Sequence, residues 1–357
     1  MAEPSRFDTE PGDNGEVSRP GVSALFLRRN GIRHIDEVEA ELRVGYKKAG
    51  ILIPYSGLNV SQLMVNGRHY CRLRLDRPTS DAKYLSPRDS GSQLYIPQAA
   101  PFGPELVICE GEFKSLALAE AGVRAVAIGG ISSAMSEGEL LPDLSRILRK
   151  FNPGAVYFQG DADTCFIFQF SLEAVKLAKA LPPGCTLRPP RIPITMPNGI
   201  DDVRQKLGDE FLAFWEKIKN TATPVPPKLS PSELAASLAL QELHPMAMLP
   251  NRDTLMSRLT ELASYLGPLA LDRLARGVTK EFGHPLKTFC EAAKRRATDR
   301  EAPFAKEWRQ QHLPQKRSAI QTGQRPPSEN RTSRQRQPAS LGLRSEGWVN
   351  TRQARIL

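Results

Sequence analysis

The sequence predicts an α/β protein built on a parallel β-sheet, with a small α+β unit before the sheet and a helical region after it. Three observations support this prediction. Between residues 104 and 220, apolar strands alternate with helical patterns, which is typical of a parallel sheet covered on both faces. Before residue 104, short strands are separated by turn residues. After residue 220, only helical patterns occur until a polar, basic tail begins.

The predicted boundaries divide the chain into six segments. They are a disordered N-terminus (1–21), an α+β unit (22–103), the parallel-sheet domain (104–220), a proline-rich linker (221–233), a helical region (234–300) and a disordered basic tail (301–357). The disorder predictions follow from segments that are rich in charged residues, Pro, Gly and Ser and poor in apolar side chains.

The bulk composition is that of an ordinary globular protein. Of 357 residues, 40% are hydrophobic and 25% are charged, and the length predicts more than one domain. No stretch approaches the ~20 apolar residues of a membrane span, and the N-terminus lacks the apolar core of a signal peptide. We therefore expect a cytoplasmic protein that does not enter a membrane. The five cysteines are scattered without a CxxC pair, so no zinc ribbon or disulfide framework is predicted.

The positive charge is concentrated near the C-terminus. The net charge is +10, and residues 301–357 hold 11 Lys or Arg against 4 Asp or Glu. The rest of the chain is therefore only mildly basic. An overall positive net charge suits a polyanionic partner but does not identify one.

In the α+β unit, two short helices are predicted because each helical pattern ends on a glycine, at Gly31 and at Gly45. Strands are predicted where apolar runs are bounded by turn residues, at 51–57, 61–67 and 69–76. The following stretch, KYLSPRDSGSQLYIP, is predicted to be a loop with aromatic anchors.

In the parallel-sheet domain, ELVICE is a continuous apolar strand, and GEFKSLALAEAG is a helix that stops at Gly122. The next predicted elements are strands at 123–130 and 155–163, a helix at 171–181 and an extended segment at 186–195. Four further helices with apolar stripes are predicted to form a small bundle, at 232–244, 252–266, 269–283 and 285–297.

Acidic residues follow two of the predicted strands. Glu110 ends the first strand, and Asp161 and Asp163 end the third. Because ligands of open parallel sheets bind at the carboxyl ends of the strands, these three carboxylates are expected to converge. Clustered carboxylates repel one another unless a cation is present. Oxygen ligands without His or Cys favour Mg²⁺ or Mn²⁺, and such ions serve phosphoryl-transfer chemistry.

An alternative without a metal is also open. Glu110 and Glu112 would then cap the following helix and favour its dipole, and the two aspartates would cap the next helix. Glu112 itself has two interpretations, as a further metal ligand or as a charge at the helix start.

The strand–Glu–Gly–helix pattern followed by Asp-x-Asp resembles a known family. Residues 104–207 are similar to the TOPRIM domain, a Rossmann-like domain of bacterial-type primases, topoisomerases, OLD-type nucleases and recombination proteins. Glu110, Gly111, Asp161 and Asp163 occupy the motif positions, and EGEFKSLAL looks like the version in phage and plasmid primase-helicases. The resemblance implies that the three acids are catalytic and hold divalent metal. Glu112, which we include as a candidate ligand, and Lys114 depart from many bacterial primases.

The preceding unit is similar to the primase segment just before TOPRIM. That segment has a strand with arginine and a Lys-Tyr-Leu…Leu-Tyr motif; the matching positions are Arg72, Arg74, Lys83, Tyr84 and Tyr95. The resemblance implies that this unit faces template and incoming nucleotide across from the metal. Long cations suit triphosphate and backbone phosphates. The first four residues and Lys114 are therefore candidates for nucleotide or nucleic-acid binding. Ordinary surface Arg and Lys are the alternative.

A third segment, PNGIDDVRQKLGDEF, resembles a Lys-Gly-Ile-Asp-Asp motif of mobile-element primase-like proteins. Asn198 replaces the lysine. Asp201 and Asp202 are either acids that support the metal site or a helix N-cap.

Together these features predict a primase-like TOPRIM protein of a phage, plasmid or integrative element. Its activity would be metal-dependent nucleotidyl transfer, that is, primer synthesis on single-stranded DNA from nucleoside triphosphates. No GxxxxGK[ST] motif is present, so a helicase partner would be a separate protein. Two alternatives stay open: a metal-dependent TOPRIM nuclease, and a non-catalytic DNA-binding module that recruits replication partners.

Overall fold

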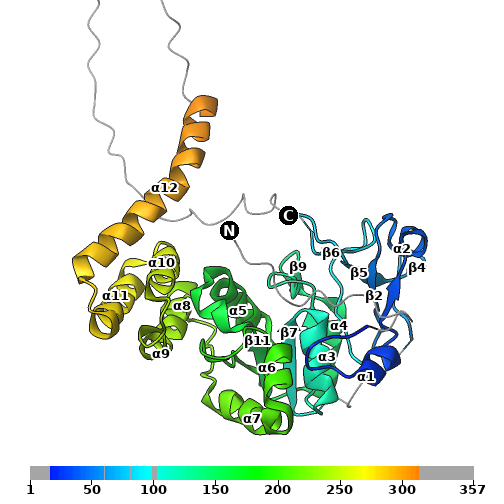
Figure 1. Cartoon of the computed structure of the whole chain (residues 1–357). Helices are drawn as coiled ribbons and strands as arrows, with labels where there is room; N and C mark the ends of the chain where they lie inside the picture. The colour runs from blue at the N-terminus through cyan, green and yellow to red at the C-terminus, as the bar shows by residue number, and fades with distance from the viewer. Residues whose placement is uncertain (1–16, 60, 81, 99–102, 313–357) are drawn as a thin grey trace, which may run out of the picture. The chain divides into compact units, whose positions relative to one another are not determined.

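The structure is a computed structural model that describes residues 17–59, 61–80, 82–98 and 103–312 (Figure 1). Most of the predicted disordered N-terminus and of the predicted basic tail lies outside these residues. Within the described part of the chain, no helix has the length and apolar character needed to cross a membrane. The described residues up to Ala305 belong to one compact unit.

The N-terminal unit is a four-stranded antiparallel sheet with two helices and a small hairpin. The sheet order is β1-β2-β5-β6. The elements are α1 (Ala24–Arg29), β1 (Arg33–Ile35), α2 (Glu37–Val44), β2 (Gly50–Pro54), β3 (Met64–Val65), β4 (Arg68–His69), β5 (Cys71–Leu75) and β6 (Tyr84–Leu85). Both predicted helices are present, and Gly45 ends α2 in the left-handed conformation. β6 lies in the stretch predicted to be a loop, because its two residues pair with β5.

The second sheet is parallel throughout, as predicted. Its order is β12-β11-β7-β8. The strands are β7 (Glu105–Glu110), β8 (Ala125–Ile128), β11 (Ala155–Gln159) and β12 (Thr186–Arg188). The apolar runs in the sequence reflect burial on both faces: Leu106, Val107, Ile108 and Cys109 are each at most 2% exposed.

Helices cover both faces of the parallel sheet (Figure 1). Leu106 and Ile108 of β7 pack with side chains of α4 and α5, whereas Val107 and Cys109 pack with those of α3, α6 and α7. The bounds of these elements and of a small hairpin are α3 (Glu112–Glu120), β9 (Met135–Ser136), β10 (Glu139–Leu140), α4 (Pro142–Phe151), α5 (Phe168–Ala180), α6 (Ile200–Leu207) and α7 (Phe211–Thr221).

The helical region packs on the sheet domain and shares its core. Phe158 of β11 and Phe170 of α5 belong to the same buried cluster as Leu274 of α11. The helices are α8 (Pro231–Leu240), α9 (Leu243–Ala247), α10 (Arg252–Ala263), α11 (Pro268–Phe282) and α12 (Leu286–His312). The proline-rich stretch before α8 is itself packed, since the buried Val225 donates its backbone N–H to Leu187 of β12 at 2.9 Å. α12 also continues beyond the predicted boundary at residue 300.

The N-terminal unit contacts the parallel-sheet domain through both backbone pairing and buried apolar side chains. Tyr95 pairs with Ala127 of β8 through two backbone hydrogen bonds of 2.8 and 2.9 Å. Val17 and Val22 are buried in a cluster with Phe113 of α3. The prediction of disorder was therefore wrong for residues 17–21, because tertiary contacts bury their few apolar side chains.

Candidate active site

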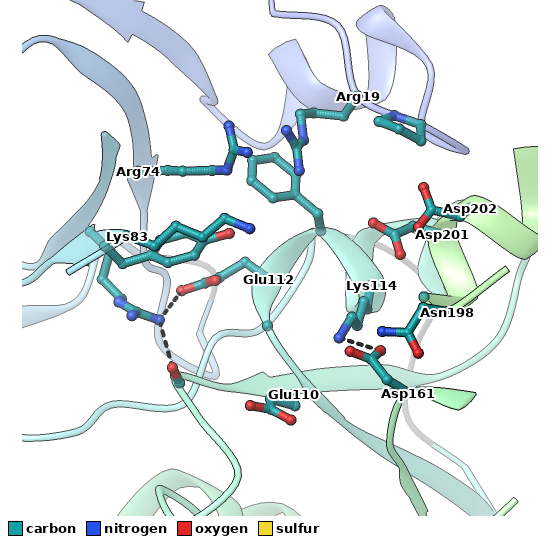
Figure 2. A pocket seen from close by; sticks show the side chains of 17 residues that line it. Arg19, Arg74, Lys83, Glu110, Glu112, Lys114, Asp161, Asn198, Asp201 and Asp202 are labelled. Carbon is teal, nitrogen blue, oxygen red and sulfur yellow. Dashed lines mark hydrogen bonds and ion pairs between the residues drawn. The ribbon is translucent and has the colours of Figure 1, made fainter. Parts of the chain in front are cut away.

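A cavity of about 480 Å³ lies where the carboxyl ends of β7 and β11 meet the N-terminal unit (Figure 2). Five acidic and five basic side chains line it, and two of the bases are paired with acids. The acids are Glu110, Glu112, Asp161, Asp201 and Asp202, and the bases are Arg19, Arg72, Arg74, Lys83 and Lys114. The cavity therefore has the mixed charge that a metal and a phosphate ligand would require together.

The backbone explains why Glu110 and Asp161 reach this edge. Glu110 is the last residue of β7, and Gly111 then turns the chain into α3 with φ +98°, a conformation that glycine adopts readily. Asp161 follows β11 at the start of a 3₁₀ helix, η1 (Ala162–Phe166). Neither helix start has a side-chain capping hydrogen bond. The capping alternative thus has no support in the observed hydrogen bonds.

Burial and mutual repulsion make the acids of the cavity hard to ionise. Burial raises the pKa of Glu110, and the neighbouring Asp161 raises it further, against the opposing effect of Lys114. Burial likewise raises the pKa of Asp161. The pKa of Asp201 is raised by burial and then by Asp202. Such a cluster attracts a cation.

Lys114 supplies the cation in this structure. Its Nζ lies 2.5 Å from Oδ1 of Asp161 (Figure 2). Burial lowers the pKa of Lys114, but Asp161, Asp201 and Glu110 outweigh it, so the pKa is raised. Lys114, predicted from the sequence to bind nucleotide or nucleic acid, is thus engaged with a predicted metal ligand.

Asp163 does not line the cavity. Its Oδ2 accepts a hydrogen bond of 2.9 Å from Nη2 of Arg258 in α10. The structure therefore brings together two of the three predicted acids, Glu110 and Asp161, and adds Asp201 and Asp202 to them. Within the described ranges, no three His, Cys, Asp or Glu side chains are arranged to hold a metal ion.

The donor set still fits Mg²⁺ or Mn²⁺. Only carboxylates supply acidic ligands here, and the ammonium of Lys114 already occupies a cation's place beside Asp161. Mg²⁺ keeps several waters and binds proteins through one or two carboxylates plus substrate phosphates. Glu110 and Asp161 are enough for that mode of binding.

Glu112 and Arg72 form a buried junction between the two sheets. Nη1 of Arg72 donates to Oε1 of Glu112 at 2.6 Å and to the backbone oxygen of Gly129 at 3.3 Å. The hydroxyl of Tyr55 donates to the same Oε1 at 2.6 Å. The Arg72 guanidinium also stacks on Tyr84, 4.7 Å from the ring centroid. Glu112 is fully buried, and it thus faces Arg72 rather than the other predicted metal ligands.

Arg74 and Lys83 remain available on the basic side, and Arg19 joins them (Figure 2). None of the three has an ion pair with an acid among the described residues. Burial lowers the pKa of Lys83, and Arg74 and Arg19 lower it further. Arg19 was not predicted as a site residue, since no strand or helix pattern marks its position.

The segment before α6 closes the acidic side. Gly199 is the N-cap of α6, so the N-cap interpretation of Asp201 and Asp202 was wrong; both lie inside the first turn and line the cavity. The backbone oxygen of Asn198 accepts a hydrogen bond from the Ala162 amide at 2.9 Å. The side-chain Oδ1 of Asn198 also accepts from the Asp163 amide at 3.2 Å. Asn198 thus ties this segment to the Asp-x-Asp loop.

Comparisons with known proteins give partial fold similarity. No family model and no curated protein matches the chain. A solved DnaG primase catalytic domain bound to ssDNA is 19% identical, with a TM-score of 0.43 over 74% of this chain and 86% of that chain. A DNA primase domain from Pseudomonas aeruginosa is 18% identical, with a TM-score of 0.44 over 77% and 89%. The E. coli primase catalytic core is 18% identical, with a TM-score of 0.42 over 74% and 88%. None of these comparisons assigns the chain to a family.

Proposed function

We propose that the protein is a primase-type nucleotidyltransferase that makes primers on single-stranded DNA from nucleoside triphosphates, using Mg²⁺ or Mn²⁺. One observation carries the proposal: a single cavity is lined by Glu110 and Asp161 at the strand ends and, across from them, by Arg74 and Lys83, for which the described residues supply no acidic partner. The same proposal includes an origin in a phage, plasmid or integrative element and a separate helicase partner.

The acids would bind the divalent ion that assists formation of the new phosphodiester bond. Glu110 and Asp161 would hold the divalent ion, which when bound would polarise the phosphoryl oxygen and favour ionisation of the attacking hydroxyl. In the reaction, the primer 3′-hydroxyl oxygen bonds to the α-phosphorus, and the bond from that phosphorus to pyrophosphate breaks. Glu110 would help to activate the attacking hydroxyl through that ion.

The basic side would hold phosphates. Arg74 and Lys83 lie across the cavity from Glu110 and Asp161 (Figure 2). Charge-assisted hydrogen bonds from such side chains bind phosphates strongly. Tyr84 lies beneath Arg72, and Arg72 is held by Glu112, so this pair would shape the wall of the site.

Primer synthesis with labelled nucleotides, in Mg²⁺ and in Mn²⁺, tests the catalytic claim. Glu110→Gln and Asp161→Asn should each lower product formation by at least about 100-fold, the scale of losing a catalytic group. Asp209→Asn is the control, because Asp209 is exposed on a second 3₁₀ helix, η2 (Gly208–Glu210). Wild-type product levels from Asp161→Asn would overturn the proposal.

A non-catalytic DNA-binding module is the second candidate. The observation in its favour is that both aspartates of the Asp-x-Asp pair already have basic partners, Lys114 and Arg258. Single-stranded DNA binding that weakens with salt, survives Glu110→Gln together with Asp161→Asn, and occurs without any product would support it. Metal-dependent nicking of plasmid DNA without added nucleotides would instead identify a nuclease.

A further inference from the structure

We propose that residues 17–22, the N-terminal strap, complete the cavity, and that Arg19 joins Arg74 and Lys83 as the third cation of a site for the triphosphate of a nucleotide. This inference rests on the proposed function and extends it, because it names the chemical group that the basic side binds.

The strap is held in place by specific contacts. Nη1 of Arg204 donates to the backbone oxygens of Gly21, at 2.6 Å, and of Ala117 in α3, at 2.9 Å. Gly21 has φ +64°, and a Cβ there would lie 2.2 Å from the backbone oxygen of Asp201. With Val17 and Val22 buried at either end, the segment between them has a defined path past the cavity.

This path directs Arg19 into the site. Its guanidinium lies over the ring of Phe113, 4.3 Å from the centroid, and faces the cavity (Figure 2). Nε of Arg19 is buried and has no hydrogen-bond partner in the described structure, and the same is true of Nε of Arg74. Buried donors without partners cost free energy, and an oxygen-rich ligand would satisfy them.

The charges around Arg19 are not balanced. Burial lowers the pKa of Arg19, and Arg74 lowers it further; Asp201 and Asp202 oppose this, but neither is within ion-pair distance. Arg72 and Lys114, by contrast, are each paired with an acid. The basic side thus carries excess positive charge in the free protein.

The arrangement favours a triphosphate over a DNA backbone. A single strand carries one negative charge per nucleotide, spread along its length. A triphosphate places several charges in one compact group, and Arg19, Arg74 and Lys83 line one cavity of about 480 Å³. Three cations at one place match the compact group.

Isothermal titration at fixed salt tests this inference with three probes: dATP, inorganic tripolyphosphate and a dT oligonucleotide. Arg19→Ala should weaken dATP and tripolyphosphate binding by about 10- to 100-fold, the contribution of charge-assisted hydrogen bonds. Oligonucleotide affinity should change by less than about twofold. Arg146→Ala is the matched control, because Arg146 is exposed on α4, contacts Asp143 and carries the same charge; it should leave all three affinities unchanged.

Two outcomes would overturn the inference. A larger loss for the oligonucleotide than for dATP would assign Arg19 to the DNA backbone, and no loss for any probe would remove it from anion binding. If Arg19→Ala fails to fold, Arg19→Gln replaces it, because glutamine keeps an aliphatic stem over Phe113. Arg74→Ala removes a second cation of the same site and must weaken dATP binding by the same factor. The titration measures binding without turnover, so it is independent of primer synthesis. A protein that binds dATP through Arg19 but makes no primer would overturn the proposed function and leave this inference standing.

Discussion

At the residue scale, the acids of the cavity differ in how their charge is balanced. Glu112 is paired with Arg72 and Asp161 with Lys114, whereas Glu110 and Asp201 have no ion pair within the described residues. Asp201 is 8% exposed, and its pKa is raised by burial and then by Asp202. Its ionised form therefore destabilises the folded protein.

The raised pKa of Asp201 makes the stability of the protein depend on pH. Between the ordinary carboxyl pKa near ~4 and the raised pKa of Asp201, the folded state binds more protons than the unfolded state. The free energy of unfolding contributed by Asp201 is thus highest below the ordinary pKa and falls as pH rises through the raised one. Lys114 and Arg19 act against this effect without reversing it.

Asp201→Asn should therefore raise the free energy of unfolding at pH 7, by on the order of 1 kcal/mol, and flatten its fall above pH ~4. Urea unfolding across pH 4–8 measures both effects, and Asp209→Asn, at an exposed position, should leave the curve unchanged. A less stable Asp201→Asn at pH 7 would show that Lys114 and Arg19 favour the ionised form.

At the element scale, short segments without regular structure decide which side chains meet. The strap brings Arg19 to the cavity, and Asn198 links the start of α6 to the Asp-x-Asp loop. α10 contributes Arg258, which pairs with Asp163. Each contact joins segments far apart in the sequence, so local patterns carried no sign of them.

Gly21→Ala should dislodge the strap. The added Cβ would meet the Asp201 backbone oxygen at 2.2 Å, in addition to the strain of φ +64°. We expect a loss of more than about 2 kcal/mol in the free energy of unfolding, or release of the strap with weaker dATP binding.

Gly67→Ala is a control that introduces the backbone strain of a positive φ without a steric clash of the added Cβ. Gly67 has φ +74° in the β3–β4 turn, and its added Cβ would meet nothing within 4 Å. It should cost only the backbone strain of about 1–2 kcal/mol and leave dATP affinity unchanged. Equal effects of the two substitutions, measured by urea unfolding and by titration, would show that the close approach of Gly21 to Asp201 is unimportant.

At the scale of the whole molecule, the sheet domain and the helical region are one structural unit. α8 and α11 contribute to the same buried cluster as β11 and α5, and the described residues of the helices form no separate core. This arrangement predicts that the two regions unfold together.

Leu274→Ala should thus destabilise the sheet domain as well as α11. Leu274 is fully buried, and the cavity left by the substitution should cost about 2–5 kcal/mol in a single cooperative transition. Leu269→Ala, on the same helix but at a position that is 69% exposed, should change stability by less than about 0.5 kcal/mol. Two separate transitions in circular dichroism and Trp fluorescence would contradict a shared core.

The sequence by itself determined the parallel sheet and the acids at its edge. Continuous apolar strands and glycine-terminated helices are local patterns, and the end of a strand places Glu110 or Asp161 without knowledge of the rest of the fold. Only the tertiary structure decided which charges are paired: Lys114 with Asp161, Arg72 with Glu112, and Arg258 with Asp163. It also decided that Arg19 enters the cavity, because the position of that side chain depends on packing against α3 and α6. Local patterns reflect burial and backbone preference, whereas ion pairs depend on distances between segments that only the folded chain brings together.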